Sequence, residues 1–186
     1  MKISDVTNRL ENCPVVAAVR GESLADAINS PAEIIFLLDG SVMNVADYIM
    51  SAHAAGKLIF IHIDLIKGIG KDRCGVEFLK KLGADGIIST RAMLIKNAHD
   101  LNLLSVQRFF AVDSQGIETA REMILTTKPD FIEIMPGVID KVTEKFVSFN
   151  IPVIAGGLIE TKSEVTSALS HGAIAVSTGK KEIWSV

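Results

Sequence analysis

Short apolar runs recur along the chain about every two dozen residues, which is the period of a βα unit in a (β/α)8 barrel. A stretch with helical spacing follows each run, as in "VMNVADYIMSAHAAG" and "GIETAREMILTT". The eight runs occupy residues 15–20, 34–39, 58–64, 86–90, 109–113, 131–135, 152–157 and 173–178. This pattern predicts an α/β fold, a compact (β/α)8 TIM barrel that forms a single domain over residues 1–186.

The alternative fold is an open doubly wound sheet, which shows the same alternation of strands and helices. The number of runs, and the absence of G-x-G-x-x-G after the first of them, favour the closed barrel. The stretch "KGIGKD" at 67–72 contains glycines and lysines but lacks the spacing of a P-loop. Thr161 followed by Glu164 is the pattern of a capping box, so a helix is expected to begin there.

Composition fits such a barrel. Hydrophobic residues make up 48% of the chain and aromatic residues 5%, which suits strands of Ile, Val, Leu and Ala buried on both faces. The net charge of −3 argues against a dense basic face for nucleic acid. Cys13 and Cys74 show no metal spacing, the N-terminus lacks a signal-peptide core, and no apolar run reaches the roughly 20 residues that span a bilayer. We therefore expect a cytoplasmic protein with reduced thiols, no membrane contact and no metal or other cofactor.

Alternation along the strands assigns side chains to the barrel interior, because the set that faces the helices must be apolar. In "FIHID" the isoleucines must face the helices, which turns His62 and Asp64 inward, and the same rule turns Glu133 inward in "FIEIM". The polar residues placed inward, at or near the C-terminal ends of their strands, are Arg20, Asp39, His62, Asp64, Asp113 and Glu133. The ligand sites of such barrels are assembled at that end.

Some of these assignments have purely structural alternatives. Asp39 and Asp113 are each followed by Gly or Ser, so each is as well placed to cap a helix or begin a turn as to contact a ligand. Glu133 lies deeper in its strand, where a buried carboxylate needs a partner, and we expect that partner to be Arg20. An Arg–Glu pair with no role beyond stability is the alternative.

The seventh and eighth runs both end in residues that let the backbone approach a ligand. In many barrels the loops after these two strands, with a short extra helix, bind a phosphate through backbone N–H groups. Glycine keeps a Cβ out of the way of the anion. The sequence therefore predicts a phosphate site at the C-terminal face, formed by Gly156, Gly157, Ser177, Thr178 and Gly179. The stretch "KKEIW" is the expected extra helix.

The sequence lacks the residues that several reactions known in such barrels require. No strand carries an inward lysine for a Schiff base, and no set of His and carboxylate ligands comes from several strands to hold a metal. We identify no catalytic residues, although an acid–base site made of Asp and Glu alone stays open. Carboxylates at the mouth accept hydrogen bonds from hydroxyls, so the ligand expected from the residues is a small polyol phosphate.

The chain resembles the glycerol-3-phosphate-responsive antiterminator family over nearly its whole length. The most specific segments are "IHIDLIKGIGKD", "GADGIIST", "KPDFIEIMPG" and "IPVIAGGLI". The resemblance implies a barrel that binds glycerol 3-phosphate as its effector and then acts on leader mRNA, so that transcription passes a terminator. It places the phosphate on the five residues of the predicted site and the glycerol hydroxyls near Asp64 and Glu133, with Arg20 nearby. The family more often has a serine where this chain has Gly179.

Three functions are compatible with the sequence. The first is a sensor that acts on RNA, for which the resemblance is the only support. The second is a small phosphosugar isomerase or lyase, and the third is a binding protein that regulates through a protein partner. Turnover of a polyol phosphate would favour the enzyme, and ligand-dependent retention of leader RNA would favour the sensor.

Overall fold

The computed structural model describes residues 1–111 and 113–185, and eight parallel strands in it close into a barrel. The strands are β1 (Val15–Val19), β2 (Ile34–Leu37), β4 (Leu58–His62), β6 (Gly86–Ser89), β7 (Leu104–Phe110), β8 (Phe131–Met135), β9 (Val153–Gly156) and β10 (Ala175–Thr178). Their order around the barrel is β1-β10-β9-β8-β7-β6-β4-β2. Two short strands, β3 (Gly40–Ser41) and β5 (Ile66–Lys67), pair with each other after β2 and β4. The predicted (β/α)8 barrel is confirmed.

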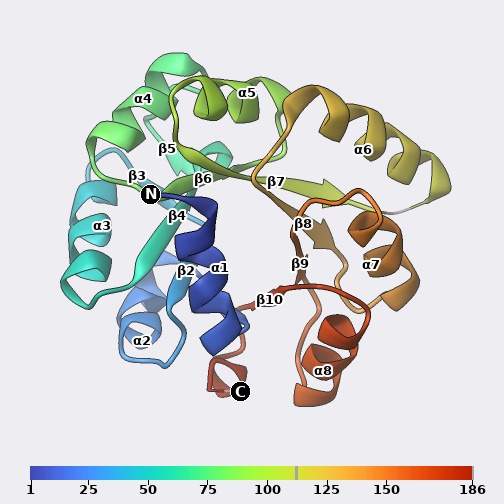
Figure 1. Ribbon diagram of the computed structural model, residues 1–186. Helices are drawn as coiled ribbons and strands as arrows, with labels where there is room; N and C mark the ends of the chain where they lie inside the picture. Colours follow the sequence, from blue (N-terminus) through green and yellow to red (C-terminus); the bar gives the residue numbers. More distant parts are fainter. Residues whose placement is uncertain (112, 186) are drawn as a thin grey trace.

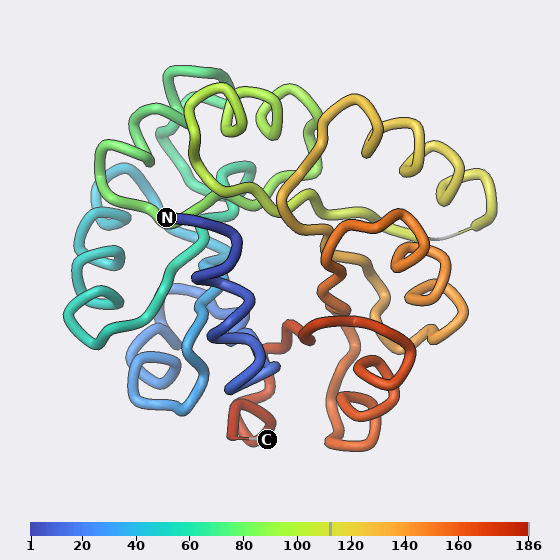
Figure 2. The backbone as a smooth tube through the Cα atoms, in the orientation of Figure 1, coloured from blue at the N-terminus to red at the C-terminus, as the bar shows by residue number. Residues whose placement is uncertain are grey.

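Helices surround the barrel in chain order, as Figures 1 and 2 show. They are α2 (Leu24–Ile28), α3 (Val45–Ala54), α4 (Arg73–Lys81), α5 (Ala92–Asp100), α6 (Ser114–Thr127), α7 (Asp140–Val147) and α8 (Lys162–Ser170), with 3-10 turns η1 (Gly21–Ser23), η2 (Ile63–Leu65) and η3 (Lys181–Ile183). The capping box predicted at Thr161 and Glu164 opens α8. None of the described helices is long and apolar enough to cross a membrane.

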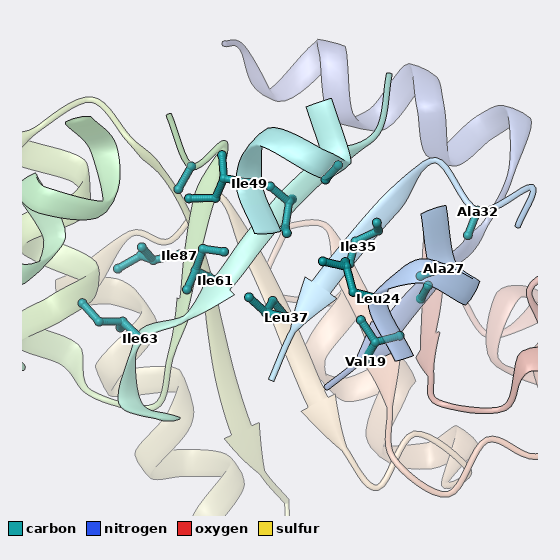
Figure 3. Packing of buried hydrophobic residues seen from close by; sticks show 14 of the residues in the cluster. Val19, Leu24, Ala27, Ala32, Ile35, Leu37, Ile49, Ile61, Ile63 and Ile87 are labelled. Atoms are coloured by element: carbon teal, nitrogen blue, oxygen red, sulfur yellow. The ribbon is translucent and has the colours of Figure 1, made fainter. Parts of the chain in front are cut away.

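The apolar side chains pack in an inner and an outer shell. The inner shell fills the barrel and includes Val16, Phe36, Phe60, Ile88, Phe131 and Ile154. Helix α1 (Ile3–Asn12) adds Val6 and Leu10 to that shell, and it crosses the barrel in Figure 1. The outer shell joins strands to helices, and Figure 3 shows part of it, where Ile35, Leu37 and Ile61 lie near Leu24 and Ile49. Helix α1 therefore covers the N-terminal end of the barrel and leaves the C-terminal end uncovered.

The fifth strand corrects the sequence prediction. It was expected at 109–113, but β7 runs from Leu104 to Phe110. Polar residues interrupt its hydrophobic pattern, and two of them, Ser105 and Gln107, face outward because they alternate with the inner-shell residue Val106. The Ser105 hydroxyl donates to Asp130 at 2.9 Å, and Gln107 accepts from the Thr127 hydroxyl at 2.6 Å. Phe109 alternates with Asp113 and would share its expected inward orientation, but it packs in an outer cluster with residues of α6 and α7.

Two of the inward assignments are wrong for related reasons. In β2 Ile34 and Phe36 belong to the inner shell, so the alternation along the strand turns Asp39 toward the outside. Its Oδ1 accepts a hydrogen bond from the Gly21 amide at 2.7 Å. A strand that is apolar on both faces carries no alternation from which to read its orientation. Asp113 lies beyond the end of β7 and is the N-cap of α6, where it accepts from the Gly116 amide at 2.7 Å.

Candidate functional site

A cavity of about 510 Å³ opens at the C-terminal end of the barrel, between the loops that follow β9 and β10. Four of the five residues predicted to bind phosphate line it, namely Gly157, Ser177, Thr178 and Gly179. Its other walls include Ala18, Leu38 and Met135 from the strand ends and Glu160 and Lys180 from the loops. The cavity therefore lies where barrels of this kind bind phosphate groups.

The loop after β9 has an unusual backbone. Gly157 has φ +74° and Leu158 has φ +61°, so two consecutive residues are left-handed. A leucine in this region costs about 1–3 kcal/mol, a cost that is found most often at ligand sites. Within the described residues, the backbone amides of Gly157, Leu158 and Gly179 donate no hydrogen bond. Three main-chain donors at the cavity are therefore free to bind an anion.

The two hydroxyls of the predicted site are engaged inside the protein. Ser177 Oγ donates to Glu133 Oε1 at 2.6 Å, and Thr178 Oγ1 donates to the Ile159 carbonyl at 2.7 Å. Thr178 thus ties the loop after β9 to β10, and its own carbonyl accepts from Trp184 Nε1 at 2.8 Å. The hydroxyls shape the cavity, which leaves the backbone amides as its donors. The expected extra helix is present only as the single turn η3.

Gly156 is a glycine for an internal reason. A Cβ built at this position would lie 2.5 Å from Ser177 Oγ and 2.8 Å from Glu133 Oε1. Such contacts are shorter than non-bonded atoms allow, so any side chain would break the bond between Ser177 and Glu133. Gly156 therefore does not line the cavity but supports the floor beneath it.

Glu133 is fully buried on the inward face of β8, as predicted, but its partner is not Arg20. Arg108 of β7 supplies Nε, 2.6 Å from Glu133 Oε2. Arg20 is exposed and lines a neighbouring cavity of about 600 Å³ together with Asp39 and Lys67. Arg108 is not among the predicted site residues because the fifth strand was expected to begin at residue 109, after Arg108. The signal was there, since Arg108 stands two residues after Val106, an inner-shell residue.

His62 and Asp64 lie on the β4 side of the same end, as expected. Asp64 Oδ2 accepts from the Ser89 hydroxyl at 2.8 Å and the Thr90 amide at 3.0 Å, and Asp64 Oδ1 lies 3.2 Å from Arg91 Nε. His62 is 4% exposed. Burial lowers the pKa of His62 to about 4, and the positive charge of Arg108 acts in the same direction. His62 is therefore neutral at pH 7.

This pKa predicts a loss of stability in acid. The unfolded state takes up a proton near pH 6.5 and the folded state only near pH 4, so His62 destabilises the fold progressively as the pH falls between these values. Between pH 7 and pH 5 the free energy of unfolding should fall by about 2 kcal/mol through this residue. Urea unfolding of the wild type and His62→Leu at both pH values measures it. An equal fall in both proteins would contradict the assignment.

Comparisons with known proteins agree with one another. The family described as "Glycerol-3-phosphate responsive antiterminator" matches residues 15–184. Uncharacterized protein YgcP of Escherichia coli (strain K12) is 36% identical over 183 residues, which cover 95% of this chain and 94% of that protein. The glycerol uptake operon antiterminator regulatory protein of Listeria monocytogenes aligns with a TM-score of 0.87 and 34% identity, over 91% of this chain and 94% of that one. A glycerol uptake operon antiterminator-related protein of Thermotoga maritima aligns with a TM-score of 0.84 and 32% identity, over 92% and 98%.

Proposed function

Because the chain belongs to the glycerol-3-phosphate responsive antiterminator family, we propose that it is a regulator that binds glycerol 3-phosphate in the cavity at the barrel mouth and then acts on leader mRNA. The observation that carries the ligand part is the set of free amides at Gly157, Leu158 and Gly179 around this cavity. Backbone N–H groups of this kind are suited to a phosphate group.

The charge at the cavity rim supports an anionic ligand. Lys180 Nζ lies 3.5 Å from Glu160 Oε1, and both side chains are at least half exposed. A bound phosphate would compete with Glu160 for this ammonium group. The phosphate would then contact the ammonium group of Lys180 at the rim and the free amides of the loop, and it would stay partly exposed to water.

This arrangement predicts opposite effects of two neutral substitutions. Lys180→Met should weaken glycerol 3-phosphate binding by up to about fivefold, and Glu160→Gln should strengthen it by a similar factor, because exposed pairs contribute about 0.2–1 kcal/mol. Titration calorimetry at low and high salt measures both. Both effects should shrink as salt rises, and a loss of affinity in Glu160→Gln would place the phosphate elsewhere. Lys162→Met, on the first turn of α8 outside the cavity lining, is the matched control.

The RNA part has its support in the family and in charges at the same end of the barrel. Arg20 and Lys67 are exposed there, and each lines the cavity that adjoins the phosphate site. Other basic side chains are less available. Lys71 Nζ donates to the Ile63 and Ile66 carbonyls, and Lys181 lies 2.5 Å from Asp26. Direct RNA contacts would therefore concentrate on the side of Arg20 and Lys67.

Retention of leader RNA on the purified protein, with and without glycerol 3-phosphate, tests this function. We expect retention that requires the ligand and falls steeply with salt, because phosphate contacts release counterions. Retention that is independent of the ligand, or absent although the ligand binds, would contradict the proposal and favour action through a protein partner. Consumption of the ligand during incubation would favour the enzyme instead.

The acid–base alternative has less support. Glu133 is the deepest carboxylate at the mouth, and its two oxygens already accept from Arg108 and Ser177. Both oxygens are thus engaged inside the protein, which leaves neither of them free to exchange a proton with a ligand. The oxygens of Asp64 are engaged in the same way, since Oδ2 accepts from Ser89 and Thr90 and Oδ1 lies beside Arg91.

A further inference from the structure

A second cavity, of about 600 Å³, lies beside the phosphate cavity at the same end of the barrel. It is bounded by the ends of β1 and β2 and by the small sheet of β3 and β5, which places Gly40, Ser41 and Lys67 in its wall. This small sheet is separate from the closed barrel. The cavity is therefore an addition to the barrel, and its volume lies within the ~300–1,000 Å³ that is typical of small-ligand sites.

Tyr48 is held in the wall of this cavity by the residues around it. A Cβ built at Gly21 would lie 2.4 Å from Tyr48 Oη, so a side chain at residue 21 would push the ring out of its place. Asn44 Nδ2 donates to the Tyr48 hydroxyl at 3.1 Å, and Asn44 Oδ1 accepts from the Ser41 amide at 2.7 Å. The ring and the amide group are therefore fixed before a ligand binds.

Polar groups of the same wall have hydrogen-bonding capacity to spare. The Tyr48 O–H, the second N–H of Asn44 and Asp39 Oδ2 have no partner among residues 1–111 and 113–185. Asp39 Oδ1 accepts from the Gly21 amide, which leaves one oxygen of this carboxylate free. The wall thus offers two donors and one acceptor. The edge of an unpaired nucleobase carries both donors and acceptors, and proteins recognise such bases through that edge.

Charged residues of both signs line the cavity, namely Arg20, Lys67, Glu22 and Asp39. Arg20 and Lys67 are exposed, and neither pairs with a carboxylate in the part of the chain that the structure describes. Lys71, the next cation along the chain, donates to two backbone carbonyls instead. The two positive and two negative side chains leave no net charge, which disfavours a simple anion. They suit a ligand that carries a phosphate group at one end and N–H donors at the other.

Apolar surface distinguishes the ligand class further. Leu38 and Leu65 line the cavity, and Leu65 is 47% exposed. A sugar phosphate carries hydroxyls on all sides, whereas a nucleobase has two flat apolar faces. The planar guanidinium of Arg20 is a further surface of the kind on which unpaired bases stack. The cavity therefore fits a nucleotide better than a second sugar phosphate.

The two cavities share a wall. Leu38 lines both of them, and its amide donates to the Val19 carbonyl at 2.8 Å where β1 and β2 end. A nucleotide in the second cavity would lie one side chain away from a ligand in the phosphate cavity. Its binding is therefore placed to depend on whether the phosphate cavity is occupied.

We propose that the second cavity binds one unpaired nucleotide of the leader RNA, with its base against Tyr48, Asn44 and Asp39 and its phosphate at Arg20 and Lys67. The proposal rests on the proposed function, because it takes RNA to be the partner. It adds that the protein recognises a single-stranded nucleotide in a cavity and does not read the charge of the RNA backbone alone.

Substitutions outside the phosphate cavity provide the first test, with leader RNA and saturating glycerol 3-phosphate. Tyr48→Phe removes one hydroxyl without a change of charge, and it should weaken RNA binding at least about threefold. Lys67→Gln should weaken it at least about threefold and reduce the salt slope by about 0.7, the value for one phosphate of a single strand. Fluorescence anisotropy of labelled RNA measures both effects, and thermal unfolding shows that each variant is folded.

A matched control separates the cavity from the overall charge. Lys145→Gln makes the same change of charge at an exposed position on α7, and it should leave RNA binding within about twofold. All three variants should bind glycerol 3-phosphate within about twofold of the wild type. An equal loss in Lys145→Gln, or unchanged RNA binding in Tyr48→Phe, would overturn the nucleotide cavity and leave the proposed function standing.

Wild-type protein with different ligands provides the second test. Leader RNA should bind at least about tenfold more tightly than a fully paired RNA duplex of the same length, because a paired base does not enter the cavity. Adenosine and uridine 5′-monophosphate should bind at least about a hundredfold more weakly than leader RNA, since they lack the contacts of the remaining strand. A duplex or a monophosphate that binds as tightly as leader RNA would overturn the proposal. No retention of leader RNA at all would overturn the proposed function, and the nucleotide cavity with it.

Discussion

Glu133→Ala is expected to lower the free energy of unfolding by about 3–5 kcal/mol, because it leaves the guanidinium of Arg108 buried and unpaired. Glu133 is 0% exposed, and it holds both Arg108 Nε and the Ser177 hydroxyl at 2.6 Å. Without it neither group has an acceptor. Urea unfolding at pH 7 measures the loss, and Glu144→Ala, an exposed position on α7, should change stability by no more than about 0.5 kcal/mol.

A double substitution separates loss of the pair from loss of packing. Glu133→Leu combined with Arg108→Met replaces both charges by apolar groups, and such replacements of buried pairs are often neutral or stabilising. The double variant should therefore be more stable than Glu133→Ala. If it is less stable, the destabilisation comes from the shape of the site rather than from an unpaired charge. A loss below about 1 kcal/mol in Glu133→Ala itself would mean that water reaches Arg108.

Filling the cavity is the second large effect that we expect. Ala18→Leu adds apolar atoms at the cavity wall from a strand position, and it should weaken glycerol 3-phosphate by at least about a hundredfold, or 2.7 kcal/mol. The fold should persist, since the cavity of about 510 Å³ has room for the side chain. Titration calorimetry gives the affinity, and thermal unfolding shows that the variant is folded. Unchanged affinity would remove the ligand from this cavity.

Gly157→Val addresses the same cavity with a different consequence. The sequence predicts that it abolishes phosphate binding and leaves the fold intact. A β-branched residue at φ +74° is strained, however, so the structure predicts a stability loss of about 1–3 kcal/mol as well. Ala18→Leu is the cleaner variant, because a Cβ is already present at residue 18. If both variants lose binding, the loss follows from the occupied cavity and not from backbone strain.

The fold could be predicted from the sequence because its period is regular, but strand faces could be read only where polar residues marked them. His62 and Glu133 each stand between isoleucines, and both point inward as expected. Strand β2 is apolar on both faces and has no polar residue to mark its inward face, so the predicted orientation of Asp39 was wrong. In β7 the outward-facing Gln107, whose Oε1 accepts from Thr127 of α6, interrupts the hydrophobic pattern, and Arg108 was therefore not predicted.

Some features of the cavity could likewise be predicted from the sequence, and others could not. Its lining by Gly157 and Gly179 follows from the positions of the last two strand ends, which the sequence does contain. The roles of Gly156 and Ser177 do not, because they depend on the distance across the barrel to Glu133. The sequence does not contain this distance. It shows only a glycine and a serine at strand ends, and phosphate binding is the simplest role to predict for them.

Titration of the purified protein with glycerol 3-phosphate, with free glycerol as the control, tests the central claim most directly. The account predicts saturable binding of one phosphate ester per chain and no binding of glycerol, because the free amides at the loops after β9 and β10 recognise the phosphate. No binding of the phosphate ester, or equal binding of glycerol, would contradict it.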